Sequence, residues 1–434
     1  MSDGAPLGIT YEITQPLGGC APRPVRQEPV PVKQGSGSKT CVKSDRATER
    51  DINREAKRKR FALQRVSAFL LPNERVAHCL RRRIDPEGVK TWLSEQARAF
   101  YSGLLVCGWV WGCPVCASKI SERRRVELFE AIRRWMERGG TVFLLTLTIP
   151  HHAGEGLEKL LNKLTLARRL MRNRKGWKRI FRRMNLRYWI CALEVTVGPN
   201  GWHCHTHELL FCLLQPLGTS NHPSNLLSDL PTDLPAKEST AEIFSRQILP
   251  LWQSACVSAG LPRPNEHGVD LRNAECAAGY ASKWGLECEM TKSHIKKGKE
   301  GQRSPWDLLG DFAETGDCDF ADWFKEYASA FKGKHQLSWS KGLRADLGIG
   351  EEKSDQDLVT ELREKAVLLG MLSPSEWALV LKTEARAHVL EAAEASGWPG
   401  VQELLKRLER MKLGVFESVG KKDSKTDRPA HIAG

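Results

Sequence analysis

Three histidines occupy alternate positions in the stretch GWHCHTHELLFC, residues 201–212. The apolar residues around them predict a β-strand, in which residues two apart face the same side. His203, His205 and His207 would then share one face, and neighbouring imidazoles can converge on a single metal ion. We therefore expect a metal site here, in preference to a strand whose histidines only pack or face solvent.

Glu194 lies in the preceding stretch, 188–197, which also predicts a strand. The sequence GPNG at 198–201 is typical of a four-residue turn, and a hairpin closed by it would place Glu194 opposite His205. Imidazoles and a carboxylate with open positions suit a divalent cation, such as Mg²⁺ or Mn²⁺, that must also bind substrate oxygens. Glu194 is therefore expected to join the histidines as a metal ligand.

Residues 275–284 predict a helix that carries Tyr280 and Lys283 one turn apart on the same face. A phenol, with a pKa of about 10, is a poor nucleophile unless a cation stabilises the phenolate. Lys283 and a nearby metal could both do so. We expect Tyr280 to be a catalytic nucleophile with Lys283 beside it; a tyrosine that only packs is the simpler alternative.

Cys113 and Cys116 form a CxxC pair that leads into a predicted helix, which is typical of a zinc knuckle. Cys107 and the more distant Cys79 could complete a four-cysteine site, and His78 could replace Cys79. A redox pair would be expected beside a βαβ unit, whereas a basic, helix-rich region precedes this pair. The sequence therefore favours a structural Zn²⁺ site.

Residues 168–187 contain ten arginines and lysines and no acidic residue, with Trp177 and Phe181 between them. Such a run can simply be a solvated face, but without acidic partners contact with DNA phosphates is favoured, and the aromatic rings could stack on unpaired bases. A later basic segment could close over the bound strand. The residues expected at DNA are Arg172, Arg174, Lys175, Lys178, Arg179, Arg182, Arg183, Lys296 and Lys297.

The whole chain of 434 residues has a net charge of +14 and a pI near 9.2, which favours an anionic partner such as nucleic acid. No apolar run approaches the roughly 20 residues needed to span a bilayer, so no membrane partner is expected. The first residues lack the pattern of a secretory signal. We therefore expect a cytoplasmic protein.

Predicted strands and helices alternate through the middle of the chain. The strands are expected at 141–150, 188–197, 202–214 and 268–272, and the helices at 157–172, 241–259 and 275–284. Because two of the strands form a hairpin, this order predicts an α+β fold with a central antiparallel sheet and flanking helices.

Composition divides the remainder of the chain. We expect a disordered basic leader (1–51), a basic helical region with the cysteine knuckle (52–137), the sheet domain (138–310), a helical C-terminal region (311–420) and a disordered tail (421–434). Within the C-terminal region, amphipathic helices are expected at about 374–396 and 399–412, the first opened by a capping-box spacing at Ser373.

Three stretches in this order resemble the motifs of plasmid rolling-circle replication initiators, members of the HUH (His-hydrophobic-His) endonuclease superfamily. They are LTLT at 145–148, LEVTVGPNGWHCHTHELLF at 193–211 and GYASKWGLECEMTKSHIKKG at 279–298. The segment CGWVWGCPVCASKISERRR at 107–125 also resembles a cysteine-rich segment that precedes these motifs. The resemblance covers roughly residues 75–310, and its middle motif is the most specific.

The resemblance implies the HUH nuclease fold for 138–310. It matches His205 and His207 to the paired metal ligands, because apolar residues follow them, and it supports Glu194 as the acidic ligand. Thr206 departs from the large hydrophobic residue of the pattern, and His203 with His205, around Cys204, fits the literal pattern too.

The resemblance also implies a reaction. The enzyme would bind the double-strand origin of a plasmid, single-stranded at the nick, and Tyr280 would form a 5′-phosphotyrosine and release a 3′-OH primer. Host helicase and polymerase would be further partners. Some relatives end the cycle with a glutamate one turn before the tyrosine, where this chain has Cys276 and, one residue earlier, Glu275.

Three alternatives remain open. A transposase or a relaxase belongs to the same superfamily, but relaxases commonly place the tyrosine before the histidines, whereas Tyr280 follows them. A zinc-dependent DNA-binding repressor would use the histidines for a structural ion and need no nucleophile. A metal-dependent phosphohydrolase would leave no bond between protein and DNA.

Overall fold

The structure, a computed structural model, describes residues 46–213, 239–273, 301–360 and 365–420. Side chains are described within these ranges except at 46–50 and 412–420. The predicted leader up to residue 45 and the predicted tail lie outside them. So does the segment 274–300, which contains Tyr280, Lys283, Lys296 and Lys297 together with Glu275 and Cys276.

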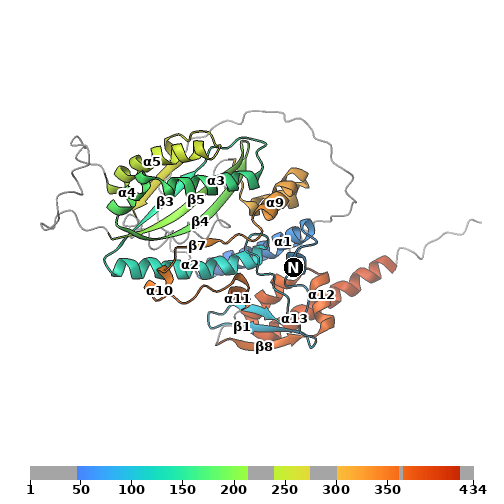
Figure 1. Cartoon of the computed structure of the whole chain (residues 1–434). Helices are drawn as coiled ribbons and strands as arrows, with labels where there is room; N and C mark the ends of the chain where they lie inside the picture. The colour runs from blue at the N-terminus through green and yellow to red at the C-terminus, as the bar shows by residue number, and fades with distance from the viewer. Residues whose placement is uncertain (1–45, 214–238, 274–300, 361–364, 421–434) are drawn as a thin grey trace, which may run out of the picture.

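A five-stranded antiparallel sheet forms the centre of the molecule (Figure 1). Its order is β6-β3-β5-β4-β7, so the histidine strand β5 is the middle one. The strands are β3 (Thr141–Thr148), β4 (Leu186–Gly198), β5 (Gly201–Cys212), β6 (Val269–Asn273) and β7 (Leu337–Trp339). The predicted central antiparallel sheet is confirmed.

The hairpin of β4 and β5 has the predicted register. Val197 pairs with Trp202, and Glu194 pairs with His205. The turn ends at Gly201, whose φ of +84° lies in the region that favours glycine. A Cβ atom there would also lie 2.9 Å from the carbonyl oxygen of His152, so two constraints require glycine at this position.

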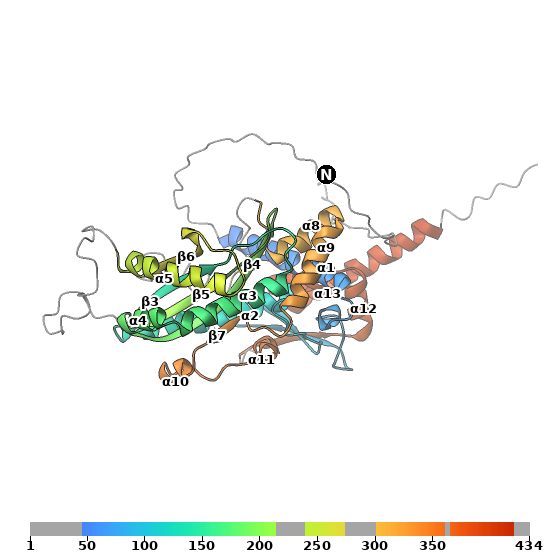
Figure 2. The same ribbon diagram turned by 45° about the horizontal axis from the view of Figure 1, so that its top comes forward.

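Helices cover both faces of the sheet (Figures 1 and 2). On one face lie α3 (Leu157–Asn173), α4 (Lys175–Arg183) and α5 (Thr240–Ser258), whose apolar side chains pack with Phe143, Leu145 and Leu147 of β3. On the other face lies α2 (Pro114–Glu137), which buries Leu128 and Trp135 against Leu209 and Phe211 of β5. The predicted flanking helices are therefore confirmed.

A second antiparallel sheet joins distant parts of the chain. It contains β1 (Val89–Leu93), β2 (Ala99–Ser102) and β8 (Val367–Leu372), in the order β2-β1-β8. Strands β7 and β8 both follow residue 310, so the C-terminal region is not purely helical and contributes to both sheets. Neither strand was predicted, because β7 has only three residues and β8 begins with exposed Val367 and Leu368.

The predicted helical character of the C-terminal region is confirmed for its other elements. They are α8 (Pro305–Thr315), α9 (Cys318–Ala330), α10 (Leu343–Asp346), α11 (Asp355–Thr360), α12 (Pro374–Lys382) and α13 (Arg386–Gly420). The capping box of Ser373 and Glu376 is present. The helix expected over 374–396 is instead interrupted near Glu384, whose φ is +53°, and α13 is kinked at Gly397.

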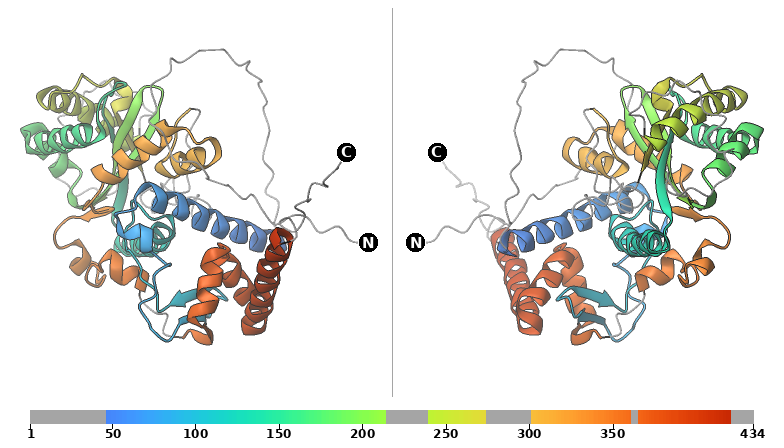
Figure 3. Two further views of the ribbon diagram at one scale, coloured as in Figure 1. Left: turned by 90° about the vertical axis from the view of Figure 1, so that its right-hand side faces the viewer. Right: turned by 90° about the vertical axis from the view of Figure 1, so that its left-hand side faces the viewer.

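The long helix α1 (Arg46–Leu70) connects these parts. It packs against α2, α8 and α13, and in Figure 3 it lies between the central sheet and the helices α12 and α13. Two short 3₁₀ helices, Arg75–His78 and Glu266–Gly268, complete the described elements. Within the described ranges, no helix combines the length and the apolar composition needed to cross a membrane.

Candidate metal centres and nucleic-acid interface

Glu194, His205 and His207 come together at one end of the central sheet. The Oε2 atom of Glu194 lies 2.9 Å from Nε2 of His207 and 3.3 Å from Nε2 of His205. On the next strand, the Thr146 hydroxyl lies 3.0 Å from Nδ1 of His207. The threonine and the carboxylate thus contact opposite nitrogens of the same ring, which fixes its orientation.

These three residues could hold a metal ion. Their ligand atoms all lie within 4.8 Å of one another. Glu194 and His207 are buried, whereas His205 is half-buried, so the group has one side near solvent. Two imidazole nitrogens and one carboxylate oxygen provide three ligands, and a divalent cation would keep positions for substrate. The donor set therefore fits the expected metal.

His203 lies beside this group and outside it. Its ring centroid is 5.3 Å from that of His205 and 5.0 Å from that of His151. Burial, and then the neighbouring His205 and His151, lower the pKa of His203 to about 4. His203 is therefore neutral at pH 7. Sequence reasoning missed His151, although the pair His151-His152 directly after the strand that ends near Pro150 was a possible signal.

Cys79, Cys107, Cys113 and Cys116 form a second candidate metal centre. The Sγ atom of Cys116 lies 3.6 Å from that of Cys79 and 3.5 Å from that of Cys107, and Cys113 lies 3.8 Å from Cys79. Sulfurs bound tetrahedrally at the usual Zn–S distance would be about 3.8 Å apart. All four thiols are free and buried, so the donor set fits the expected zinc, with Cys79 in the group.

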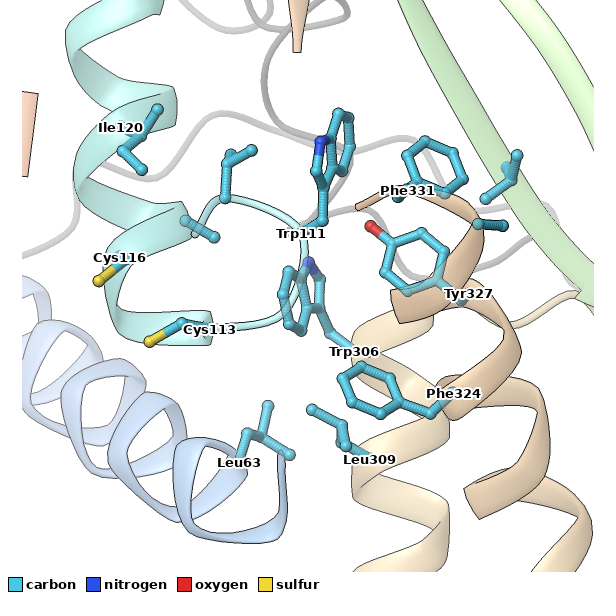
Figure 4. Close-up of a cluster of buried hydrophobic side chains, with 14 of the residues drawn as sticks. Leu63, Trp111, Cys113, Cys116, Ile120, Trp306, Leu309, Phe324, Tyr327 and Phe331 are labelled. Carbon is cyan, nitrogen blue, oxygen red and sulfur yellow. The ribbon is translucent and has the colours of Figure 1, made fainter. Parts of the chain in front are cut away.

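The cysteine centre lies next to an aromatic cluster (Figure 4). Trp111, from the loop before Cys113, packs against Phe331 with 4.6 Å between ring centroids. The side-chain amide of Gln64 donates to Cys113 Sγ at 3.3 Å, and the backbone N–H of Cys107 donates to Cys79 Sγ at 3.4 Å. N–H donors directed at sulfur stabilise thiolates, as is common around metal-bound cysteines.

The basic segment 168–187 is divided between internal and external roles. Arg168 Nε donates to Glu208 at 2.7 Å, and Arg172 binds the other oxygen of the same buried carboxylate. Burial raises the pKa of Glu208, but the two guanidiniums more than offset this and hold it below its usual range. The basic segment contains no acidic residue of its own, because its partner Glu208 lies in β5, outside the segment.

The outer side of this segment forms a groove. Arg172 stacks over the ring of Trp189 at 4.1 Å, and the groove between them and α4 is also lined by Lys178, Phe181 and Arg182. Phe181 is 37% exposed, whereas Trp177 is only 4% exposed and packs in the core. Trp177 also lines the groove, but the half-buried Trp189 provides the more accessible second ring.

The other expected DNA residues follow the same division. Arg174 donates to the Ser258 hydroxyl and Arg183 to the Gln247 side chain, each at 3.1 Å. Lys175 and Arg179 are exposed on α4. The accessible positive charge thus lies on the outer side of α4.

Comparisons with known proteins agree with this geometry. A family model described as "Replication protein" matches residues 106–215, which include three of the four cysteines and the whole β4–β5 hairpin. A Streptomyces lividans protein named "Protein rep" is 28% identical over 333 residues, 64% of this chain and 72% of that protein. The predicted resemblance to a replication initiator is confirmed.

The resemblance extends to a second relative over a shorter segment. A Streptomyces cyanogenus protein named "Neomycin resistance protein" is 31% identical over 153 residues, 29% of this chain and 35% of that protein. No solved structure matches the chain significantly. The family match ends at residue 215, so it includes Glu194, His205 and His207 but not Tyr280.

Proposed function

We propose that this chain initiates rolling-circle replication of a plasmid by nicking one strand at the double-strand origin. The observation that carries the proposal is the convergence of Glu194, His205 and His207 on one point, inside the segment that matches the replication-protein family. The group combines buried ligands with one side near solvent. A site that binds a phosphodiester needs such an accessible side.

Glu194, His205 and His207 would hold a divalent metal, Mg²⁺ or Mn²⁺. When bound, such an ion polarises the scissile phosphate. The Thr146 hydroxyl at Nδ1 of His207 keeps Nε2 of the ring directed at Glu194. His203, which is neutral and lies beside His205, would help to shape the entrance to the site together with His151.

Tyr280 is the proposed nucleophile. Its phenolate oxygen would form a bond to the phosphorus while the bond from phosphorus to the 3′ oxygen breaks, and the released oxygen takes up a proton to give the 3′-OH primer. The products are a 5′-phosphotyrosine and a free 3′ end for the host polymerase. Lys283 would stabilise the phenolate before attack.

The position of Asn273, the last described residue before Tyr280 in the chain, supports this role. Asn273 pairs with Phe143, and Thr146, three residues along β3, pairs with His207. With about 4.8 Å between strands and 3.3 Å per residue, Asn273 is roughly 14 Å from His207. The seven residues from Asn273 to Tyr280 can span up to about 24 Å, so the tether is long enough.

We assign DNA binding to the exposed face of α4. Lys175, Lys178, Arg179 and Arg182 would contact phosphates, and unpaired bases would stack against Phe181 and the pair formed by Arg172 and Trp189. Because Trp189 and Glu194 point to opposite faces of the sheet, this surface would hold DNA that flanks the nick. Lys296 and Lys297 would close over the nicked strand.

The four cysteines would hold a structural Zn²⁺. The ligands come from the turn after Arg75–His78, the loop before α2 and the first turn of α2, which are 37 residues apart at their extremes. Metal binding would therefore cross-link the turn that follows Arg75–His78 to the start of α2 and to the loop before it.

A cleavage assay tests the proposal. Labelled single-stranded fragments of the plasmid that encodes the protein are incubated with Mn²⁺ and the full chain, and the covalent protein–DNA adduct is measured. His205→Ala, His207→Ala and Tyr280→Phe should each abolish the adduct, and all three should retain DNA binding. Tyr327→Phe, on the buried face of α9, is the matched control and should leave adduct formation unchanged.

The same assay separates the alternatives. Cleavage without an adduct in the wild type would indicate a metal-dependent phosphohydrolase. DNA binding without cleavage would indicate a repressor. A full adduct from Tyr280→Phe would remove this residue from its role. Strand transfer that requires transposon ends or a conjugative origin, in place of a replication origin, would indicate a transposase or a relaxase.

A further inference from the structure

Arg386, at the start of α13, is a buried cation whose guanidinium lies 5.0 Å from the centroid of the Phe61 ring and is only partly hydrogen-bonded. Its side chain is 1% exposed. One nitrogen, Nη1, donates to the Gln64 side-chain oxygen at 2.8 Å and to the Leu80 carbonyl at 3.3 Å. The other two nitrogens, Nε and Nη2, are buried without a hydrogen-bond partner among the described residues.

The carboxylate nearest to Arg386 does not balance this charge. Glu384 Oε2 lies 3.7 Å from Nη2, beyond hydrogen-bond distance. The same carboxylate is also shared with Arg81, at 3.6 Å, and its side chain is 35% exposed. Two guanidiniums and one partly solvated carboxylate leave one positive charge in excess, and a buried charge without compensation is costly.

Gln64 connects Arg386 to the cysteine centre. The Gln64 side chain is fully buried, and its amide accepts from Arg386 while donating to Cys113 Sγ at 3.3 Å. The second acceptor of Arg386, the Leu80 carbonyl, directly follows Cys79 in the chain. The guanidinium is therefore hydrogen-bonded through Gln64 to Cys113, and its second acceptor belongs to the residue that follows Cys79.

We propose that Arg386 is the counter-charge of the metal-loaded cysteine centre, and that metal occupancy is thereby linked to docking of α13. The inference rests on the proposed zinc site. Four thiolates around one divalent cation leave two negative charges in excess, which a nearby guanidinium stabilises at short range in a medium of low dielectric constant. When the cysteines are metal-free and protonated, Arg386 has no such partner.

The consequence is a reciprocal coupling. If the metal strengthens docking of α13, docking of α13 strengthens metal binding by the same factor. Helix α13 also supports the second sheet, because the Tyr101 hydroxyl of β2 donates to the Arg386 carbonyl at 2.7 Å and Trp398 packs on Gly370 of β8. Loss of the metal would therefore loosen α13 and the β1–β2–β8 sheet while leaving the central sheet folded.

A thermodynamic cycle that combines one substitution with the removal of zinc tests the coupling. The full chain and its Arg386→Met variant are each prepared zinc-loaded and, under reducing conditions, zinc-free. Zinc affinity is measured by competition with a chromophoric chelator, and stability by thermal unfolding. Arg386→Met should weaken zinc binding by about tenfold or more and lower the Tm of the loaded protein. It should leave unchanged or raise the Tm of the zinc-free protein, because a buried unbalanced charge is removed.

Arg58→Met is the matched control. Arg58 binds Glu391 of α13 from the same helix as Gln64, with 2.6 Å between Nη2 and Oε2, but contacts neither Gln64 nor a cysteine. Its substitution should lower the Tm of both forms by a similar amount and weaken zinc binding far less than Arg386→Met, because the guanidinium beside Gln64 stays in place. Arg386→Lys, which retains the charge, should recover part of the zinc affinity lost in Arg386→Met.

Hydrogen exchange of the wild type provides a second test that requires no variant. Zinc removal should accelerate amide exchange in α13, β1 and β8 more than in β3 and β5. Equal zinc affinity in Arg386→Met and wild type, or uniform exchange changes across both sheets, would overturn the coupling. A wild-type chain that binds no zinc would instead refute the proposed metal site itself, and normal zinc binding without coupling would refute only this inference.

Discussion

At the scale of single residues, two carboxylates near β5 have opposite surroundings. Glu194, in β4, faces the imidazole of His207. Glu208 directly follows His207 in β5, so its side chain lies on the opposite face of the sheet, where Arg168 and Arg172 enclose it. The guanidiniums balance the charge of Glu208 inside the protein. Imidazole ligands are neutral, so the charge of Glu194 is available to a cation. The two environments thus separate a structural carboxylate from a candidate metal ligand.

Because of the Glu208 ion pairs, the free energy of unfolding should decrease as the pH falls into the acidic range. The folded-state pKa of Glu208 lies below its unfolded value of about 4.3, so its stabilising contribution is complete above that pH and is lost as the pH falls through the lower folded value. Glu208→Gln should lower stability at pH 7 by about 3 kcal/mol, because it removes a fully buried carboxylate and leaves two half-buried guanidiniums without their partner. The variant should also lose part of the wild-type decline in stability below about pH 4.

Urea unfolding between pH 3 and 7 measures both effects. Glu158→Gln, in the exposed first turn of α3, is the control and should shift stability by only a few tenths of a kcal/mol at pH 7. Parallel stability curves for wild type and Glu208→Gln over the whole pH range would mean that Glu208 does not change its pKa on folding.

Local patterns in the sequence predicted the hairpin and its register, because a four-residue turn fixes which residues face each other. The same reasoning brought Glu194 to His205. It could not pair Arg168 and Arg172 with Glu208, since the partners lie 40 and 36 residues apart and the basic run resembles a solvated surface. It also placed Trp177 at the surface, although the 3.6-residue period of α4 turns that ring inward.

The same limit applies to long-range sheet contacts. Strands β7 and β8 carry few buried side chains, and their partners β4 and β1 precede them by well over a hundred residues. Their short, weakly patterned sequences acquire extended structure from the strand beside them. Arg386 is a comparable case, because its partner Gln64 is 322 residues away.

At the scale of elements, α4 and the start of β4 together form the aromatic and basic groove. The helix contributes Phe181 and Lys178, and the strand contributes Trp189, whose ring is held by Arg172. Because Arg172 is itself fixed by Glu208, the flat guanidinium and the indole form a rigid platform. A platform of this kind loses little conformational entropy when a base stacks on it.

Phe181→Ala should weaken binding of single-stranded DNA by about tenfold, since stacking of one base on an aromatic ring contributes roughly 1–3 kcal/mol. Fluorescence anisotropy with a labelled oligonucleotide measures the affinity. Phe129→Ala is the matched control, because Phe129 is an exposed phenylalanine on α2, 46% exposed, and should have no effect. If both variants bind as tightly as the wild type, the groove does not stack bases.

At the scale of the whole molecule, the net charge of +14 is unevenly distributed. Helix α2 is rich in arginine, but Arg124 pairs with Asp355 at 2.6 Å and Arg125 with Glu122 at 2.8 Å. On α4, neither Lys178 nor Arg179 forms an ion pair with another described residue. Part of the excess positive charge of the described residues therefore lies on α4, beside the groove.

This distribution predicts that affinity for single-stranded DNA depends on salt through α4. Each phosphate contact contributes about 0.7 to the slope of the logarithm of affinity against the logarithm of salt concentration. The double variant Lys178→Gln, Arg179→Gln should therefore reduce the slope by about 1.4, measured by anisotropy between low and moderate salt. Arg125→Gln together with Arg133→Gln removes the same charge from α2, where both arginines are already paired with glutamates, and should leave the slope unchanged. Equal reductions of the slope in both double variants would show that the charge acts through the overall electric field of the protein. Both variants remove two positive charges, and only local contacts between α4 and phosphates would make their effects differ.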